Sequence, residues 1–228
     1  MRFLGLLLLN LLLFISVLSS AELKVQSFDG VDWSKVSATE TKVVGYEKPL
    51  KVQVAVDGER LYVRVRIPQK EPNLKHRPWV LKDEKFVVGK QLEDSLALRF
   101  SQKDKKVQDL WFWGVNRTQW GFADDGFFMD EKYSPDVGKG PWKLNLNLDT
   151  LHQNRNRYLS QEASASRADV KVSTKYLNGE WRLVFSRLLN TGNDDDLNLM
   201  SEFSLSLSKD LNSPQSEALS ISVSELRK

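Results

Sequence analysis

A strict two-residue alternation of apolar and polar side chains constrains the fold of this chain more than any other feature. It is clearest in two adjacent segments, Lys51 to Val56 and Arg60 to Ile67, which flank the dipeptide Asp57-Gly58. Asp-Gly tolerates the positive φ angles of a tight turn, and the alternation gives each strand one apolar face. Pro68 ends the second strand because it cannot donate a ladder hydrogen bond. The sequence therefore predicts an antiparallel β-hairpin.

The same period recurs along the rest of the chain. Further alternating segments cover residues 95–100, 110–115, 170–176, 181–186, 203–207 and 219–223. After the N-terminal segment, no stretch sustains the i, i+3, i+4, i+7 apolar spacing of an amphipathic helix over three turns. We predict an all-β fold, an antiparallel two-sheet β-sandwich with long functional loops. The longest loops are expected at Glu71–Gly89, Ala123–Asn147 and His152–Ala168.

The N-terminus has the composition of a secretory leader. Arg2 precedes an apolar run from Phe3 to Leu18, and small residues follow as far as Ala21. The run is shorter than the ~20 residues that a membrane span needs. We predict a cleaved signal peptide over residues 1–21, a single domain over 22–228, no membrane span in the mature chain and a periplasmic location.

Composition excludes several classes of site. The chain has no Cys and two His, so disulfides, thiolate nucleophiles, cysteine zinc sites and covalently attached haem are excluded. A net charge of +3 over 228 residues is too small for a nucleic-acid-binding footprint. No hydrolase motif is present. Glu93-Asp94, Asp124-Asp125 and the run Asp194–Asp196 could be catalytic or bind calcium, or could form turns. Turn formation is favoured for Asp194–Asp196, and both interpretations stay open for Asp124-Asp125, which Gly126 and two aromatic residues follow. We expect no enzymatic activity.

The most unusual segment is Leu110-Trp111-Phe112-Trp113, which is followed within twenty residues by further aromatic side chains. In a strand, Trp111 and Trp113 share one face and Phe112 lies on the other. Two interpretations of the tryptophans stay open. They fill the core, as most sandwich tryptophans do, or they form an apolar wall for a flat ligand such as a porphyrin or a sugar ring.

Four blocks of sequence resemble the haem-binding domain of the ethylbenzene dehydrogenase γ-subunit family, also described as cytochrome c-552/DMSO reductase-like. The blocks are Val56–Val65, Glu93–Phe100, Asp109–Asp125 with its Trp-Phe-Trp motif, and Trp181–Leu197. The resemblance implies an exported domain that holds one non-covalent haem b and transfers electrons. It also implies molybdoenzyme, iron–sulfur or cytochrome subunits as partners.

Members of that family ligate the haem iron through a Met and a Lys. Here Arg99 stands at the position matched to the Met, and no Lys occurs over Ser216–Ser220. A guanidinium stays protonated and cannot ligate iron, although it suits a haem propionate. Met129 is then the best-placed axial ligand, ahead of Met200, His76 and His152. The predicted cofactor-binding residues are Trp111, Trp113, Arg99 and Met129.

Two alternatives belong to other functional classes. The first is a haem-free β-sandwich binding module for a carbohydrate or a protein partner, which the missing Met and Lys favour. The second is a structural accessory subunit that docks on a larger redox enzyme through tryptophan-rich loops.

Overall fold

The computed structural model describes residues 21–23, 26–27, 31–102, 106–118, 121–130, 132–148, 154–194, 196, 202–207, 216 and 219–221. The predicted leader, up to residue 20, lies outside these ranges, as do His152 and Met200. Within them, no helix has the length and apolar character needed to cross a membrane.

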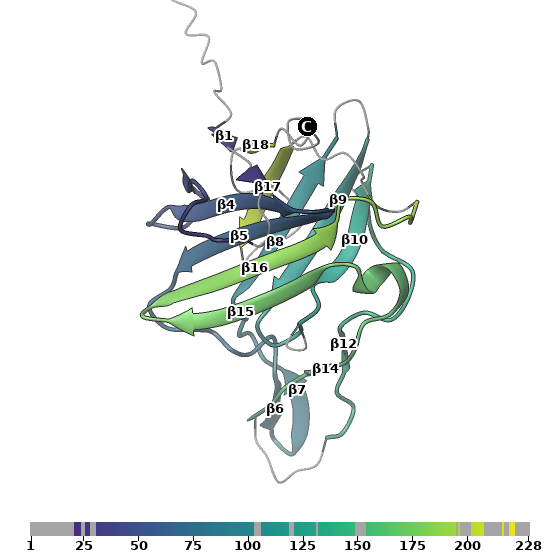
Figure 1. Ribbon diagram of the computed structural model, residues 1–228. Coiled ribbons are helices and arrows are strands. Elements are labelled where there is room, and N and C mark those ends of the chain that lie inside the picture. Colours follow the sequence, from purple (N-terminus) through teal and green to yellow (C-terminus); the bar gives the residue numbers. More distant parts are fainter. Residues whose placement is uncertain are drawn as a thin grey trace, which may run out of the picture.

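Two large sheets make up the body of the described chain. The first has seven strands, in the spatial order β1 (Ala21–Leu23), β18 (Leu219–Ile221), β17 (Glu202–Leu207), β8 (Ser95–Ser101), β9 (Val107–Gly114), β10 (Asp124–Met129) and β11 (Lys132–Pro135). The second has the order β15 (Lys171–Leu177), β16 (Glu180–Leu188), β5 (Arg60–Pro68), β4 (Leu50–Asp57) and β2 (Gln26–Ser27), and β3 (Thr39–Thr41) also pairs with β4. Figure 1 shows the two sheets stacked with their strands running in clearly different directions. The predicted β-sandwich is confirmed.

Pairing is antiparallel between all neighbouring described strands except β1 with β18 and β2 with β4. The predicted hairpin is present as β4 and β5. Its two-residue turn is Gly58-Glu59, one residue later than the sequence suggested, and Gly58 takes the positive φ of +56°. A second tight hairpin joins β15 to β16 through Asn178 and Gly179, which both have positive φ, as a primed turn requires.

The core lies between the sheets and comes from the alternating apolar faces. Sheet-facing positions of β4, β5 and β16 meet those of β8, β9 and β17. The largest fully buried apolar side chains are Trp111, Trp113, Phe100, Phe185, Phe203, Leu50, Leu61, Leu96, Leu98, Leu183 and Leu205. Each such side chain stabilises the fold by roughly 1.5–3 kcal/mol relative to exposure.

A smaller lobe projects from one end of the sandwich and is formed by loop segments that the alternation did not resolve. It contains β6 (Trp79–Lys82), β7 (Lys85–Val88) and β13 (Asn154–Arg155) in one small sheet, and β12 (Trp142–Leu144) with β14 (Tyr158–Ser160) in another. A 3-10 helix, η1 (Ala165–Ala168), follows β14. Figure 1 shows the β6–β7 hairpin extending below the sheets with β12 and β14 beside it. The lobe therefore walls one end of the first sheet.

Candidate functional site

Trp111 and Trp113 belong to the core. Both lie on the inner face of β9, with exposed fractions of 0% and 1%. The Trp111 ring packs across the sandwich against Phe185, with centroids 6.4 Å apart, and Trp113 packs against Trp181 at 5.2 Å. The indoles interlock with the opposing sheet and occupy the space that a flat ligand would need.

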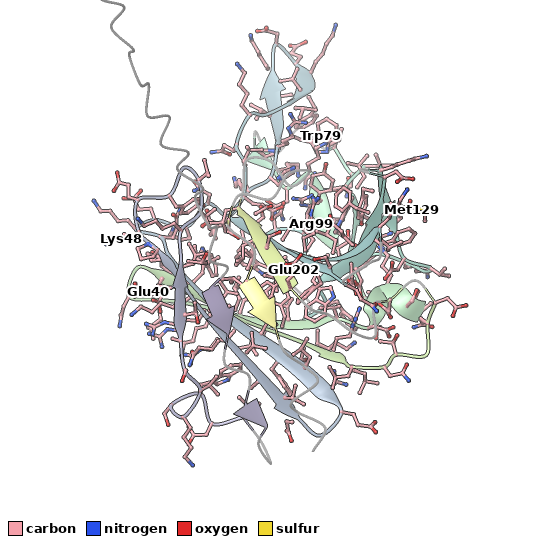
Figure 2. The ribbon with its side chains drawn as sticks, turned by 90° about the horizontal axis from the view of Figure 1, so that it is seen from above. Glu40, Lys48, Trp79, Arg99, Met129 and Glu202 are labelled. Atoms are coloured by element: carbon pink, nitrogen blue, oxygen red, sulfur yellow. The ribbon has the colours of Figure 1, made fainter. Side chains whose placement is uncertain are left out.

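The other two predicted cofactor-binding residues lie elsewhere. Arg99 is on the outer face of β8, where its guanidinium stacks over the Phe128 ring at 4.0 Å. Met129 ends β10 with 48% of its surface exposed, and Figure 2 shows it at the rim of the molecule, away from Arg99. The structure does not bring these four residues together, and they do not fit a haem.

The outer face of the first sheet carries a second, smaller apolar cluster. Phe112 points away from the core, opposite its tryptophan neighbours, as the alternation predicts. It clusters with Leu110, Ala97 and Phe128, all of which are buried. Apolar residues on an outer face are shielded from water only if another part of the chain packs over them. Here Trp142 of the lobe lies next to this cluster.

The lobe covers this cluster incompletely and leaves an aromatic groove with a volume of about 170 Å³. The groove is lined by Leu110, Phe112, Arg117, Asp124, Phe128, Tyr133 and Trp142. Its volume is below the ~300–1,000 Å³ typical of drug-sized ligands, so it suits one small ring.

The aromatic walls are held by ring contacts. Trp142 packs edge-on against Tyr158 with centroids 5.1 Å apart, and Tyr133 lies 5.6 Å from Phe128. Tyr133 crosses the strand at Gly126, where a Cβ atom would come within 2.7 Å of its ring. Burial and the nearby Asp124 raise the pKa of Tyr133, so its hydroxyl stays neutral and can donate a hydrogen bond.

The Asp124 carboxylate, which lines the groove, is held in place by two residues. Arg167 donates to both of its oxygens, from Nε at 2.6 Å and from Nη2 at 3.0 Å, and Trp142 donates from Nε1 at 3.2 Å. Gly140 makes room for this pair, because a Cβ there would lie 2.6 Å from the Arg167 guanidinium carbon. The bidentate pair orients both Asp124 and the Trp142 ring.

Arg117, which follows β9, is the second charged residue that lines the groove. Its Nε and its backbone N–H both donate to Glu93, as does the backbone N–H of Asn116. The guanidinium stacks over the Phe112 ring at 4.4 Å. Glu93, 1% exposed, is thus an anchor for the groove and not a turn residue or a catalytic acid.

His76 lies beside this anchor, with Nδ1 3.5 Å from the same Glu93 oxygen. Burial, together with the charges of Arg117, Arg77 and Arg157, lowers the pKa of His76 to about 4. Glu93 is already neutralised by Arg117, so it does not offset the burial. His76 is therefore a neutral imidazole at pH 7 and packs against Tyr158 at 5.5 Å.

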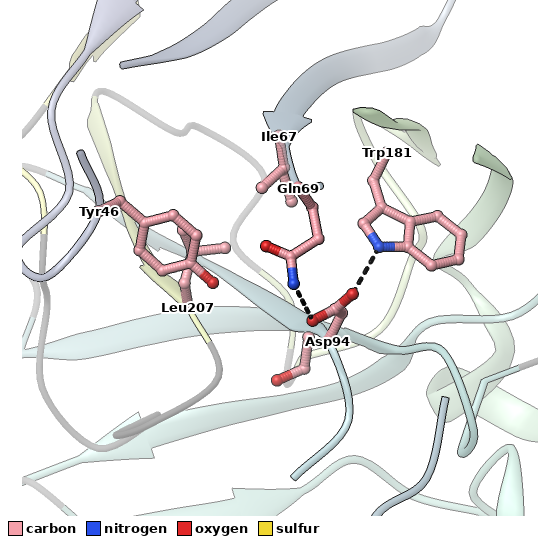
Figure 3. Close-up of a pocket in the computed structure, with 7 residues that line it drawn as sticks. Tyr46, Ile67, Gln69, Asp94, Trp181 and Leu207 are labelled. Atoms are coloured by element: carbon pink, nitrogen blue, oxygen red, sulfur yellow. Dashed lines mark hydrogen bonds between the residues drawn. The ribbon is translucent and has the colours of Figure 1, made fainter. Parts of the chain in front are cut away.

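Asp94, the neighbour of Glu93, closes the end of the core. It accepts hydrogen bonds from Trp181 Nε1 at 2.7 Å, from Gln69 Nε2 at 3.2 Å and from both nitrogens of Asn73. Figure 3 shows Asp94 between Gln69 and Trp181 in the pocket next to Tyr46. The remaining space there does not admit a water-sized sphere, so this pocket is a packing defect and not a binding site.

A buried acidic cluster lies at the opposite end of the core. One carboxylate oxygen from each of Asp109, Asp125 and Asp196 lies within 4.8 Å of the others, an arrangement that could hold a metal ion. Arg187, however, points into the cluster and donates to Asp109 and Asp196. Its guanidinium supplies the positive charge that a metal would bring, so the cluster is a buried ion-pair network.

A larger hollow of about 640 Å³ lies between surface loops and is lined by Gly45, Tyr46, Glu47, Lys48, Pro68, Gln69, Lys70, Asn178 and Gly179. Most of its lining is exposed, and Tyr46 is its one aromatic residue. It offers little surface for stacking. The groove beside Trp142 is the better candidate site.

No known protein family and no curated protein matches the sequence. A solved structure from Bacteroides uniformis, of a protein proposed to bind carbohydrate, is similar over 88% of this chain and 91% of that one, with 9% identity and a TM-score of 0.47. A family 9 carbohydrate-binding module from Caldicellulosiruptor kristjanssonii, in complex with cellotriose, is similar over 82% of this chain and 74% of that one, with 12% identity and a TM-score of 0.35.

These findings correct the expected haem-binding family. The sequence blocks that suggested the ethylbenzene dehydrogenase γ-subunit family contribute to the core strands β4, β5, β8, β9 and β16. Both similar structures named above are described as carbohydrate-binding, and neither as haem-binding. The prediction of a haem-dependent electron-transfer subunit was wrong, because the two tryptophans that carried it are core residues.

Proposed function

We propose that this chain is a haem-free carbohydrate-binding module that takes one sugar residue in the groove on the outer face of β9 and β10. The observation that carries the proposal is the combination of aromatic walls, Phe112, Tyr133 and Trp142, with two oriented charged side chains, Arg117 and Asp124. Aromatic faces offer apolar surface to the C–H face of a sugar ring. Fixed polar groups set the orientation of its hydroxyls.

Arg117 and Asp124 suit this role because other residues already hold them. Their partners, Glu93 and Arg167, fix each side chain before a ligand arrives. A preorganised site loses less conformational entropy on binding. The protein would bind and not transform its ligand, and the leader-like N-terminus supports action outside the cytoplasm, in the periplasm.

A binding assay tests the proposal directly. The purified protein is titrated with a panel of soluble oligosaccharides by isothermal calorimetry and screened against insoluble polysaccharides by pull-down. Trp142→Ala should weaken binding roughly tenfold or more, because a stacking tryptophan is a typical hot spot. Trp33→Ala is the matched control, since Trp33 lies beside Arg64 of the second sheet. Absence of carbohydrate binding, or equal loss in both variants, would refute the proposal.

A further inference from the structure

The unused hydrogen-bond donors of Arg117 narrow the class of ligand that the groove can bind. This inference rests on the proposed function. We infer that the bound sugar residue is acidic, and that Arg117 holds its carboxylate. Two features of Arg117 favour an acidic ligand, namely its unused terminal amino groups and the planar shape of its guanidinium group.

Arg117 is held from one side. Its Nε donates to Glu93, its backbone N–H donates to the same carboxylate, and its planar face lies on Phe112. Its side chain is 13% exposed and lines the groove. Within the described part of the chain, its two terminal amino groups donate no hydrogen bond. They are donors beside the cavity that are held in place and can reach a ligand.

The two charged residues that line the groove are each paired with an opposite charge. Arg117 and Asp124 line it, Glu93 and Arg167 bind these two, and Arg99 stacks on the lining ring of Phe128. Asp125 and Asp136 also act on the lining Tyr133, so net charge alone does not select an anion. Both oxygens of Asp124 are occupied by Arg167 and Trp142, so this acid does not repel an incoming anion strongly.

The geometry of the donors favours a carboxylate on a ring. A guanidinium presents its donors in a plane and matches the planar carboxylate in a bidentate pair. A sugar acid has both groups that the groove can bind. Its ring can pack against Trp142 and Tyr133, and its carboxylate can accept hydrogen bonds from Arg117. A neutral sugar would leave the Arg117 donors with a weaker, uncharged partner.

The test compares the acidic and neutral forms of one ligand. Galacturonate and glucuronate oligosaccharides are titrated into the wild-type protein by calorimetry, alongside their methyl esters and neutral oligosaccharides of equal length. We expect the acid form to bind roughly tenfold or more tightly than its ester, since a charge-assisted hydrogen bond is lost in the ester. This comparison needs no variant and decides the question even if Arg117 variants do not fold.

Variants then assign the effect to Arg117. Arg117→Lys keeps the charge and removes the planar donor pair, so the preference for acid over ester should fall several-fold. Arg182→Lys, in the Glu180 ion pair of the second sheet, is the matched control and should keep the preference. An ester that binds as tightly as the acid, or an Arg117→Lys variant with the full preference, overturns the inference. Binding of neutral sugars alone leaves the proposed function standing, whereas binding of no sugar overturns both.

Discussion

The carboxylate of Glu93 lies where the side chain of any residue larger than glycine at position 114 would begin. A Cβ atom on Gly114 would come 2.7 Å from Oε1 of Glu93 and 2.8 Å from its carboxyl carbon. This contact places the acid against the end of β9, where it accepts hydrogen bonds from the next turn of chain. The groove anchor at Arg117 therefore depends on the absence of a side chain at position 114.

Gly114→Ala should destabilise the protein by roughly 2–4 kcal/mol, because the added methyl group expels a buried, hydrogen-bonded carboxylate. Urea denaturation of the variant measures the loss. If the damage acts through Glu93, the double variant with Glu93→Ala should be hardly less stable than Glu93→Ala alone. Fully additive losses would show that Gly114 matters for another reason.

The sequence predicted most of the long strands, because a strand's position follows from the local alternation of apolar and polar residues. Alternation placed β4, β5, β8, β9, β15, β16, β17 and β18, and it put Phe112 opposite Trp111 and Trp113. It missed β10 and β11 of the first sheet, which lie in the predicted loop 123–147. It could not decide which of the two faces of β9 was the core, because both faces of this strand are apolar. The choice depends on Phe185 and Trp181, which lie far along the chain and pack against the indoles. That ambiguity produced the haem interpretation.

The groove itself could not be predicted from local patterns. Its lining comes from β9, β10, β11 and β12, and its outer wall, Tyr133 and Trp142, falls in the stretch that the sequence marked only as a long loop. The short strands there are weakly alternating and mostly exposed, so they carry little periodicity. The usable clue was aromatic residues in a long loop, a combination that favours binding.

Acid should destabilise the protein through His76. Its pKa falls from 6.5 to about 4 on folding, so the unfolded chain binds a proton that the folded chain does not. The corresponding stability is complete above pH 6.5 and is lost as the pH falls to about 4, at roughly 1 kcal/mol per pH unit. Urea midpoints between pH 7.5 and 4.5 should therefore fall less steeply for His76→Asn than for the wild type. Parallel profiles would contradict the neutral imidazole.

Asp125 should have the opposite pH dependence. It is fully buried, its Oδ2 has no hydrogen-bond partner among the described residues, and burial together with Asp109 raises its pKa well above 3.8. A raised pKa means that the stabilising contribution is present below about pH 3.8 and is lost as the pH rises. Asp125→Asn should thus gain thermal stability relative to the wild type between pH 4 and pH 8. A constant difference across that range would show that Asp125 is ionised in the folded protein.

Trp111 and Trp142 lie on opposite sides of the first sheet. We expect Trp111 to contribute mainly to stability and Trp142 mainly to sugar binding. Trp111→Leu should cost roughly 2–5 kcal/mol, because it opens a cavity between the sheets and removes the ring over which Arg187 lies at 5.1 Å. Trp142→Leu should cost much less stability, since that ring is only partly buried, but it should abolish most of the sugar binding. Chemical denaturation and calorimetric titration of the same two variants measure both quantities. Two results together would contradict this prediction: equal loss of stability in the two variants, and loss of sugar binding in Trp111→Leu. The groove would then be structural, and the ligand would bind in the interior.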